Sequence, residues 1–317
     1  MNLKRKLGLI IPHFGFVGRA MQDINQAIFH WDERQHDKTF GKLNPDLKFF
    51  VVRGNSLMGL LALYLNNLPV IYDALEKGFI PYVDFKNYKT QYNIDSPVND
   101  SLNAWEYYFE QPSNYTLEEI YHSKNVRLSG WEFYSMPKEP MTPVNDSIMR
   151  EMIKRVPVKK YIYDTAENKI KSDGIDKMIG LLVRGTDYVK LRPIGHPIPP
   201  TPENAASKLD EFMTKYGQHK IFLATEDENI YNFFVKRYGD LIYTSDTTLV
   251  KYVGTDYLCS EITSSNKYKF GLDYLVKMIC LSRCKFLIAS HTAGTRFARF
   301  LNNGSYIDEY IFNLGRY

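Results

Sequence analysis

The chain has 317 residues, a length typical of two domains or of one large domain. Hydrophobic residues make up 44% and charged residues 24%, a composition that excludes a disordered or fibrous protein. The 40 Lys and Arg residues exceed the 36 Asp and Glu residues, which gives a net charge of +4. This excess suits a bound anion or contact with a membrane surface, but it is too small to predict nucleic-acid binding.

The N-terminal segment and the cysteines indicate a cytoplasmic protein. The basic run Lys4-Arg5-Lys6 precedes an apolar run over 7–11, which is too short for a secretory signal or a membrane span. The basic residues could support a peripheral contact with an anionic membrane. Three cysteines are too few for a disulfide framework, and no histidine lies near Cys280 and Cys284, so we expect neither disulfides nor zinc.

Residues 1–175 predict a less regular α/β domain. A strand is expected over 48–52, a helix begins near Leu57, and a second strand is expected over 79–85. The aromatic segment 105–109 is expected to pack in a core. A polar and charged stretch over 167–176 indicates the boundary to a second domain over 176–317.

Residues 176–300 alternate short apolar runs with helical patterns. Strands are expected over 178–183, 220–224, 241–244 and 286–290, and helices over 202–216, 228–238, 270–282 and from about Gly294. Thr201 and Pro202 are expected to begin the first of these helices. This alternation predicts a Rossmann-like parallel sheet whose ligands lie beyond the carboxyl ends of the strands.

Arg184 directly follows the first strand of this domain and is expected to project into the ligand crevice. A guanidinium suits a phosphate or diphosphate, because it can donate two parallel hydrogen bonds. Gly185 would let a ligand approach the backbone, and Asp187 could orient the arginine. The alternative is a structural Arg–Asp pair that closes the strand end.

Three further segments contain residues that could carry chemistry. His196 lies in a proline-rich loop over 192–200 and is either structural or an orienting or acid–base group. Glu226 and Asp227 open a helix, where acids are favoured by its dipole, so they either stabilise the helix end or contact a nucleotide. Their spacing is not the Asp-x-Asp of a metal site.

The segment 290–295 joins the last predicted strand to a helix. Its N–H groups could bind phosphate, with Ser290, His291 and Thr292 beside it; the alternative is plain N-capping by Thr292 or Thr295. Arg296 and Arg299 could add to an anion site or form a solvated face. The sequence has no Gly-x-Gly-x-x-Gly motif, no P-loop and no recognisable Ser/Cys–His–Asp pattern.

Together these motifs resemble the fucosyltransferase superfamily, chiefly its α1,6-fucosyltransferases and nodulation fucosyltransferases, with weaker likeness to the α1,2- and protein O-fucosyltransferases. Segment 182–187 is similar to the family's His-x-Arg-Arg-x-Asp motif, His196-Pro197-Ile198 to its downstream His-Pro-Ile, and 223–227 to its Leu-Ala-Thr-Asp-Asp. Segment 281–292 is similar to the family's last element, which consists of a helix end, a strand and a Ser/Thr-rich turn. Arg53-Gly54-Asn55 is similar to a short motif of the protein O-fucosyltransferases. Leu182, Gly185 and Lys277 depart from the family residues at their positions.

The resemblance implies a GT-B-like α/β fold with two Rossmann-like domains facing across a cleft. The domain over 1–175 would bind the acceptor and that over 176–317 the nucleotide sugar, while the chain from about residue 303 onward could pack back on the N-terminal domain. The implied activity is inverting transfer from GDP-fucose or a related GDP-sugar to a bacterial surface glycan or its precursor, with no metal and no cofactor. The alternatives are another nucleotide sugar as donor, or a non-catalytic protein that binds nucleotides or glycans.

The resemblance also implies roles for single residues. Arg184 would hold the β-phosphate, and the remaining nucleotide-binding candidates are Asn55, Gly185, Asp227, Asp273, Ser290, His291 and Thr292. The catalytic candidates are Arg184, Asp187 and His196. The base stays open among Asp187, His196 and an acid of the N-terminal half.

Overall fold

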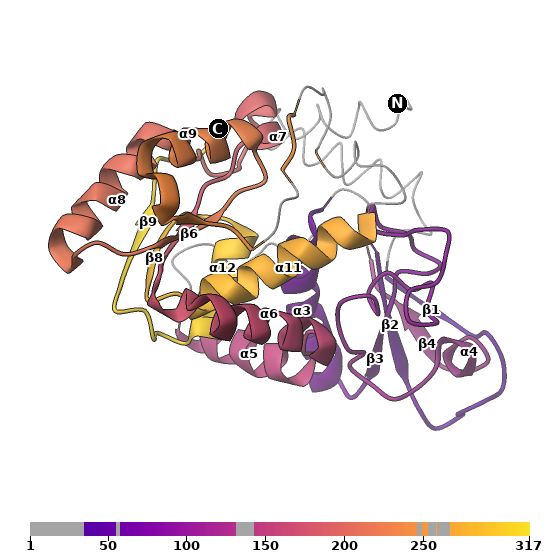
Figure 1. Cartoon of the computed structure of the whole chain (residues 1–317). Helices are drawn as coiled ribbons and strands as arrows, with labels where there is room; N and C mark the ends of the chain where they lie inside the picture. Colours follow the sequence, from indigo (N-terminus) through magenta and orange to yellow (C-terminus); the bar gives the residue numbers. More distant parts are fainter. Residues whose placement is uncertain (1–34, 55–57, 131–142, 246–248, 253–257, 259–266) are drawn as a thin grey trace. The chain divides into compact units, whose positions relative to one another are not determined.

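The computed structural model describes residues 35–54, 58–130, 143–245, 249–252, 258 and 267–317. The described residues form two compact units (Figure 1). The smaller one takes its residues from Met1–Arg53, Val70–Asp84 and Pro112–Tyr134, and the larger one from Gly54–Pro69, Phe85–Gln111 and Ser135–Tyr317. No helix among the described residues is both long enough and apolar enough to cross a membrane.

The larger unit contains a parallel sheet. Its strands within the described ranges are β5 (Ile179–Leu182), β6 (Ile221–Ala224), β7 (Ile242–Tyr243), β8 (Phe286–Ser290) and β9 (Asp308–Phe312), in the order β7-β6-β5-β8-β9. β5 is central, with Leu182 paired to Ala224 of β6 on one side and to Ala289 of β8 on the other. The predicted Rossmann-like sheet is therefore confirmed for this part of the chain.

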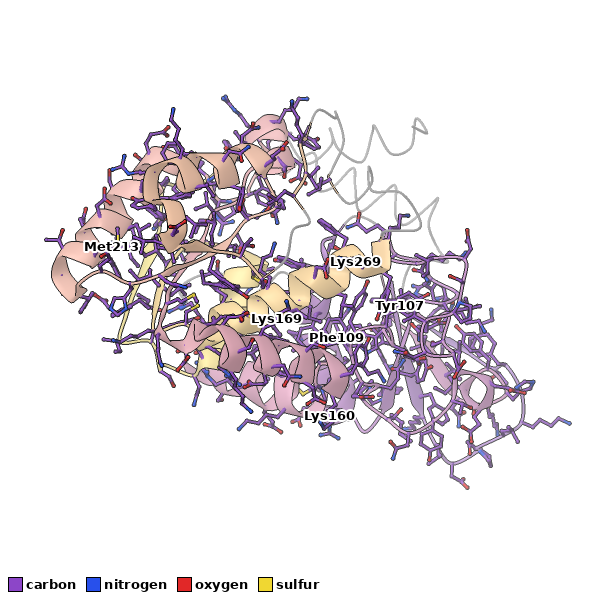
Figure 2. All side chains as sticks on the ribbon, viewed as in Figure 1. Tyr107, Phe109, Lys160, Lys169, Met213 and Lys269 are labelled. Atoms are coloured by element: carbon purple, nitrogen blue, oxygen red, sulfur yellow. The ribbon has the colours of Figure 1, made fainter. Side chains whose placement is uncertain are left out.

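Helices cover both faces of this sheet, as Figure 1 shows. Alternate strand residues such as Ile179 and Leu181 pack against α8 (Pro202–Tyr216) and α9 (Glu228–Tyr238), which add Leu209, Phe212 and Phe234. Met213 of α8, labelled in Figure 2, is partly buried against the same core. On the opposite face, Gly180 lies so close to α11 (Lys267–Arg283) that an added Cβ would be 2.7 Å from Leu281.

The helix boundaries follow the predicted caps. The Thr201 hydroxyl accepts a hydrogen bond from the Asn204 N–H at 3.2 Å, and α8 begins at Pro202. α9 has the predicted bounds and is capped by Asp227. α12 (Ala293–Asn302) begins one residue before the predicted start, with Thr292 as its N-cap.

Several elements differ from the predictions. α11 begins three residues earlier than expected, and α3 (Leu60–Glu76) begins later and extends well past the predicted helix, with Pro69 inside it. The short elements η3 (Ile175–Lys177), α7 (Thr186–Leu191) and η4 (Gly239–Leu241) were not predicted. Each is too short to show a hydrophobic period in the sequence.

The end of the chain packs on the C-terminal sheet, which corrects the expectation that it returns to the N-terminal domain. β9 pairs in parallel with β8, from Phe286 opposite Asp308 to Ser290 opposite Phe312. Only Phe312 is buried in this edge strand, so its sequence lacks a run of core residues. That is why the strand was missed.

The helices α5 (Pro143–Arg155) and α6 (Lys160–Asp173) belong to the larger unit, although they precede residue 175. α6 packs on α11 and buries Ile162, Ala166 and Ile170. The two compact units therefore group the chain differently from the predicted division into 1–175 and 176–317. Apolar contacts of α6 with a C-terminal helix explain the difference.

The aromatic segment 105–109 is core, as predicted. Trp105, Tyr107, Tyr108 and Phe109 are at most 1% exposed, and the Phe109 ring stacks on that of Tyr64 with centroids 4.2 Å apart. Tyr107 and Phe109 are labelled in Figure 2. These rings belong to the interior of the larger unit, where they are not accessible to a ligand.

The smaller unit contains a second, mixed sheet. Its strands within the described residues are β1 (His36–Lys38), β2 (Phe49–Arg53), β3 (Ile80–Asp84) and β4 (Val126–Leu128), in the order β1-β4-β2-β3, with the short helix α4 (Leu117–Ile120). β2 is parallel to β3 and β4, whereas β1 is antiparallel to β4. β2, α3 and β3 follow one another along the chain as predicted, although α3 belongs to the larger unit as far as Pro69. β1, β4 and α4 were not predicted.

Candidate functional site

The order of the C-terminal sheet determines where a ligand binds. Along the chain, β6 and β7 are added on one side of β5, and β8 and β9 on the other. The order therefore reverses between β5 and β8, and open parallel sheets bind their ligands beyond the carboxyl ends of the strands at such a point. Arg184 follows β5 and His291 follows β8, so the structure brings these two predicted segments to the same edge.

Arg184 is largely buried and held by two carboxylates. Its Nη2 donates to Oδ1 of Asp187 at 3.2 Å, and its Nε lies 3.0 Å from Oε1 of Glu226 without the alignment of a hydrogen bond. The guanidinium also stands over the Tyr188 ring, 4.4 Å from its centroid. The side chain keeps 19% exposure. Burial alone would lower its pKa, but Glu226, Tyr188 and Asp187 together raise that pKa well above its usual value.

Gly185 and Thr186 are bound to the acids that follow β6. The Gly185 N–H donates to Oε1 of Glu226 at 3.3 Å, and the Thr186 N–H donates to Oδ2 of Asp227 at 2.9 Å. Thr186 has a left-handed φ of +49°, which is unusual for a β-branched residue and strains the backbone. At Gly185, an added Cβ would lie 2.4 Å from Oδ2 of Asp227. The absence of a side chain at Gly185 thus permits a close approach to the backbone, as predicted, but in this structure the group that approaches is the Asp227 carboxylate and not a ligand.

Asp227 and Asp187 are both bound to backbone groups. Oδ1 of Asp227 accepts hydrogen bonds from the N–H groups of Asn229 and Ile230, which caps α9. Asp187 is 4% exposed, and its two oxygens accept from the backbone N–H groups of Tyr188 and Leu258. Both acids therefore stabilise the loops around Arg184.

His196 lies close to Arg184 through Tyr188. Its Nδ1 is 3.2 Å from the Tyr188 hydroxyl, and the two rings meet edge to face with centroids 5.4 Å apart. Burial, together with the charges of Arg184 and Arg316, lowers the pKa of His196 below its usual 6.5. The imidazole is therefore neutral at pH 7.

Residues 315–317 fasten the loop that carries His196. The Ile198 N–H donates to the Gly315 carbonyl at 3.0 Å, and the Tyr317 N–H donates to the His196 carbonyl at 3.1 Å. Arg316 also donates to the carbonyl of Gly195 at 2.6 Å. These bonds hold the His196 backbone in place.

The turn after β8 is closed by hydroxyl groups. The Thr292 hydroxyl accepts from the Thr295 N–H at 3.0 Å, and Thr295 Oγ1 donates to the Ser290 carbonyl at 2.5 Å. Ser290 is 1% exposed, and its own hydroxyl has no hydrogen-bond partner among the described residues. His291 is half-buried in the turn. The capping interpretation of Thr292 is confirmed.

The arginines that follow in α12 differ in exposure. Arg296 is 8% exposed and lies in the interior of the unit, so the predicted solvated face is wrong for this residue. The Arg299 side chain is 40% exposed and forms an ion pair with Glu309 at 2.8 Å, as expected for a residue on a solvated face.

A pocket opens beside these loops, at the carboxyl ends of β5 and β6. It is lined by Leu182, Ala224, Thr225, Glu226, Phe270, Asp273, Tyr274, Lys277 and Met278. Lys277 is buried and donates from Nζ to the Thr225 carbonyl at 3.0 Å, while Asp273 pairs with Lys269. Burial raises the pKa of Tyr274, and the charge of Arg184 acts in the opposite direction.

Tyr274 connects the pocket to the start of α12. A Cβ added at Gly294, in the first turn of α12, would lie 2.5 Å from the Tyr274 hydroxyl. The charge of Arg184 also affects the pKa of Tyr274. The tyrosine therefore lies near both the loop after β5, which carries Arg184, and the turn after β8. No motif in the sequence points to Tyr274, since its role depends on which helix covers the sheet edge.

The remaining site predictions lie elsewhere. Asn55 falls outside the described residues, as does Cys259, whereas Cys280 and Cys284 are buried free thiols. Among the described residues, no group of three or more His, Cys, Asp or Glu side chains is placed to hold a metal ion. The structure thus brings Arg184, Gly185, Asp187, His196 and Asp227 together, with Asp273 in the adjoining pocket.

Comparison with known proteins finds similarity in structure alone. No protein-family model matches the chain, and no curated protein matches its sequence. A NodZ alpha-1,6-fucosyltransferase soaked with GDP-fucose superposes with a TM-score of 0.50 at 15% identity, covering 80% of this chain and 92% of that one. A selenomethionine crystal of fucosyltransferase NodZ from Bradyrhizobium gives a TM-score of 0.50 at 13% identity, over 80% and 92% of the two chains.

The chain has a GT-B-like fold. POFUT1 in complex with GDP is also similar, with a TM-score of 0.37 at 11% identity over 83% of this chain and 73% of that one. That score is too low to add to the argument. The GT-B-like fold agrees with the fold class predicted from the motifs around Arg184 and His196.

Proposed function

We propose that the chain is a glycosyltransferase that takes its sugar from a nucleoside diphosphate sugar, with GDP-fucose as donor. The observation that carries this proposal is the position of Arg184, which follows the central strand β5 at the point where the strand order reverses. The fold similarity to a NodZ alpha-1,6-fucosyltransferase soaked with GDP-fucose supports the choice of donor.

In this proposal Arg184 and the first turn of α12 stabilise the leaving diphosphate. The acceptor hydroxyl oxygen bonds to the anomeric carbon as the bond from that carbon to the diphosphate oxygen breaks, and GDP leaves with the electron pair. Attack from the opposite face inverts the anomeric centre. A single preorganised donor can lower such a barrier by about 3–4 kcal/mol, so the proposed reaction uses no metal and no cofactor.

We assign the base to His196 among the predicted candidates. A base must be unprotonated and able to reach the acceptor, and His196 is half-buried with a lowered pKa. Asp187 is 4% exposed and bound to backbone N–H groups, so it orients Arg184. The proton of the acceptor hydroxyl would pass to His196 as the new glycosidic bond forms.

The nucleotide and the acceptor complete the proposal. In the pocket, Asp273 would supply hydrogen-bond acceptors for the nucleobase and Lys277 a donor. Four residues would adjoin the phosphates: Gly185, Ser290, His291 and Thr292. Asp227 would act through the Thr186 backbone. The acceptor would be a bacterial surface glycan or its precursor, bound by the N-terminal domain of a cytoplasmic enzyme with peripheral membrane contact.

The test is release of GDP from GDP-fucose, measured for the full chain and for Arg184→Lys. Lysine keeps the charge but cannot donate two parallel hydrogen bonds. We expect the rate to fall at least about tenfold in Arg184→Lys, in line with the loss of one charge-assisted bond. Arg237→Lys, at an exposed arginine paired with Asp210, should leave the rate unchanged.

Two outcomes would support the alternatives. Release from GDP-mannose, GDP-heptose or a UDP-sugar, with none from GDP-fucose, would keep the fold and change the donor. Binding of GDP without turnover of any donor would indicate a non-catalytic nucleotide-binding protein.

A further inference from the structure

One oxygen of Glu226 occupies a site built for an anion. Oε1 accepts a hydrogen bond from the Gly185 N–H at 3.3 Å and lies 3.0 Å from Nε of Arg184. It also lies 3.1 Å from the Thr186 hydroxyl, which Oδ1 of Asp187 approaches to 3.0 Å. A backbone N–H, a hydroxyl and a guanidinium are the groups that surround bound phosphate oxygens in proteins. Here a carboxylate oxygen of the chain itself fills that position.

The charge balance prevents Glu226 and a diphosphate from sharing the guanidinium. Arg184 already faces two carboxylates, those of Asp187 and Glu226. A diphosphate adds further negative charge, and like charges within a few ångströms repel strongly in a partly buried site. One carboxylate must therefore move away when the diphosphate binds.

Glu226 is the carboxylate able to move. Asp187 is 4% exposed, and its oxygens accept hydrogen bonds from backbone N–H groups at 3.0 and 3.2 Å. The side chain of Glu226 uses Oε1 for all three of its contacts among the described residues, and its approach to Arg184 lacks hydrogen-bond alignment. Glu226 is also one of the residues that line the pocket at the carboxyl ends of β5 and β6.

We propose that Glu226 is a positioning residue that holds Arg184 in the ligand-free protein and yields its place to a diphosphate oxygen. It returns to the guanidinium as the diphosphate leaves. The proposal rests on the proposed function for the identity of the donor, but the exchange itself needs only a diphosphate. No covalent bond is made or broken in this step.

Removing the charge of Glu226 has two expected effects. Glu226→Gln should bind inorganic pyrophosphate about tenfold more tightly, because the Glu226 carboxylate no longer competes for Arg184. It should also lower kcat together with KM in donor turnover, because the product diphosphate leaves more slowly. A merely structural role would weaken pyrophosphate binding and would not lower KM.

The test is calorimetric titration of the full chain with inorganic pyrophosphate. Glu228→Gln is the matched control, because it removes the same charge two residues along and should leave the affinity unchanged. Equal or weaker binding by Glu226→Gln, relative to Glu228→Gln, would overturn the proposal. So would the absence of pyrophosphate binding in both the native chain and Glu226→Gln.

A second variant guards against loss of folding. Glu226→Asp shortens the side chain by one methylene and withdraws the carboxylate from Arg184, so its affinity for pyrophosphate should fall between those of the native chain and Glu226→Gln. Tighter pyrophosphate binding without turnover of GDP-fucose would support the exchange and contradict the proposed function. Turnover of GDP-fucose with unchanged pyrophosphate affinity in both variants would support the proposed function and contradict the exchange.

Discussion

The Thr186 N–H donates a hydrogen bond of 2.9 Å to Oδ2 of Asp227, whose other oxygen caps α9. One carboxylate thus connects the loop after β5 to the start of the helix after β6. The same loop carries Arg184, so the position of the guanidinium depends on a cap that lies far away in the sequence.

Gly185→Ala should therefore disturb both the helix cap and the ligand site. The added Cβ would lie 2.4 Å from Oδ2 of Asp227 and 2.7 Å from Cδ1 of Ile230, so the cap must shift. We expect a loss of about 1–3 kcal/mol in the free energy of unfolding, measured by denaturant titration. Gly59→Ala is the control, since its Cβ would have 4.0 Å to the nearest side chain. Equal stability of the two variants would contradict this account.

Thr292→Ala should lower both stability and diphosphate binding. The Thr292 hydroxyl caps α12 at the proposed phosphate site, and Thr201 caps α8 away from it. Both alanine variants should lose about 1 kcal/mol of unfolding free energy, the usual contribution of a cap. Thr292→Ala alone should also weaken GDP binding in calorimetry. If both variants bound GDP equally well, the turn after β8 would have no part in the site.

His196 should control the acidic limb of the pH profile. Because its pKa is lowered, kcat/KM should stay constant to a lower pH than an ordinary imidazole would allow, and should then fall as the imidazole is protonated. His196→Gln should remove this limb and lower kcat by about a hundredfold or more. His219→Gln, at a histidine bound to the Lys177 carbonyl before β6, should keep the native profile.

The lowered pKa of His196 has a consequence for stability as well. The folded chain holds its proton less tightly than the unfolded chain, so the unfolding free energy should decrease as the pH falls below 6.5. This decrease should be smaller in His196→Gln. An identical pH dependence in the two proteins would show that the histidine is not buried as described.

Local signals predicted the C-terminal elements well. Thr201 and Pro202 determine the start of α8, and Asp227 determines the start of α9. These starts could be predicted because a cap acts within one helical turn of the residue itself. β9 was missed because only Phe312 of that edge strand is buried. α6 was missed because its apolar residues are few and its packing partner, α11, lies far along the chain.

The site was predictable only in part. Arg184 and His196 were found from their places after a strand and within a proline-rich loop, and the structure brings both to Tyr188. Two features could not be predicted: the contact of Arg184 with Glu226, and the position of Tyr274 between the pocket and the first turn of α12. Both join segments that are distant in the sequence, and they depend on the order of the strands.

The most direct test of the central claim is a crystal structure of the full chain soaked with GDP. The account predicts the β-phosphate against Arg184, with nitrogen–oxygen distances of about 2.7–2.9 Å, and Glu226 turned away from the guanidinium. GDP bound elsewhere, with Arg184 still held by Glu226 and Asp187, would contradict it.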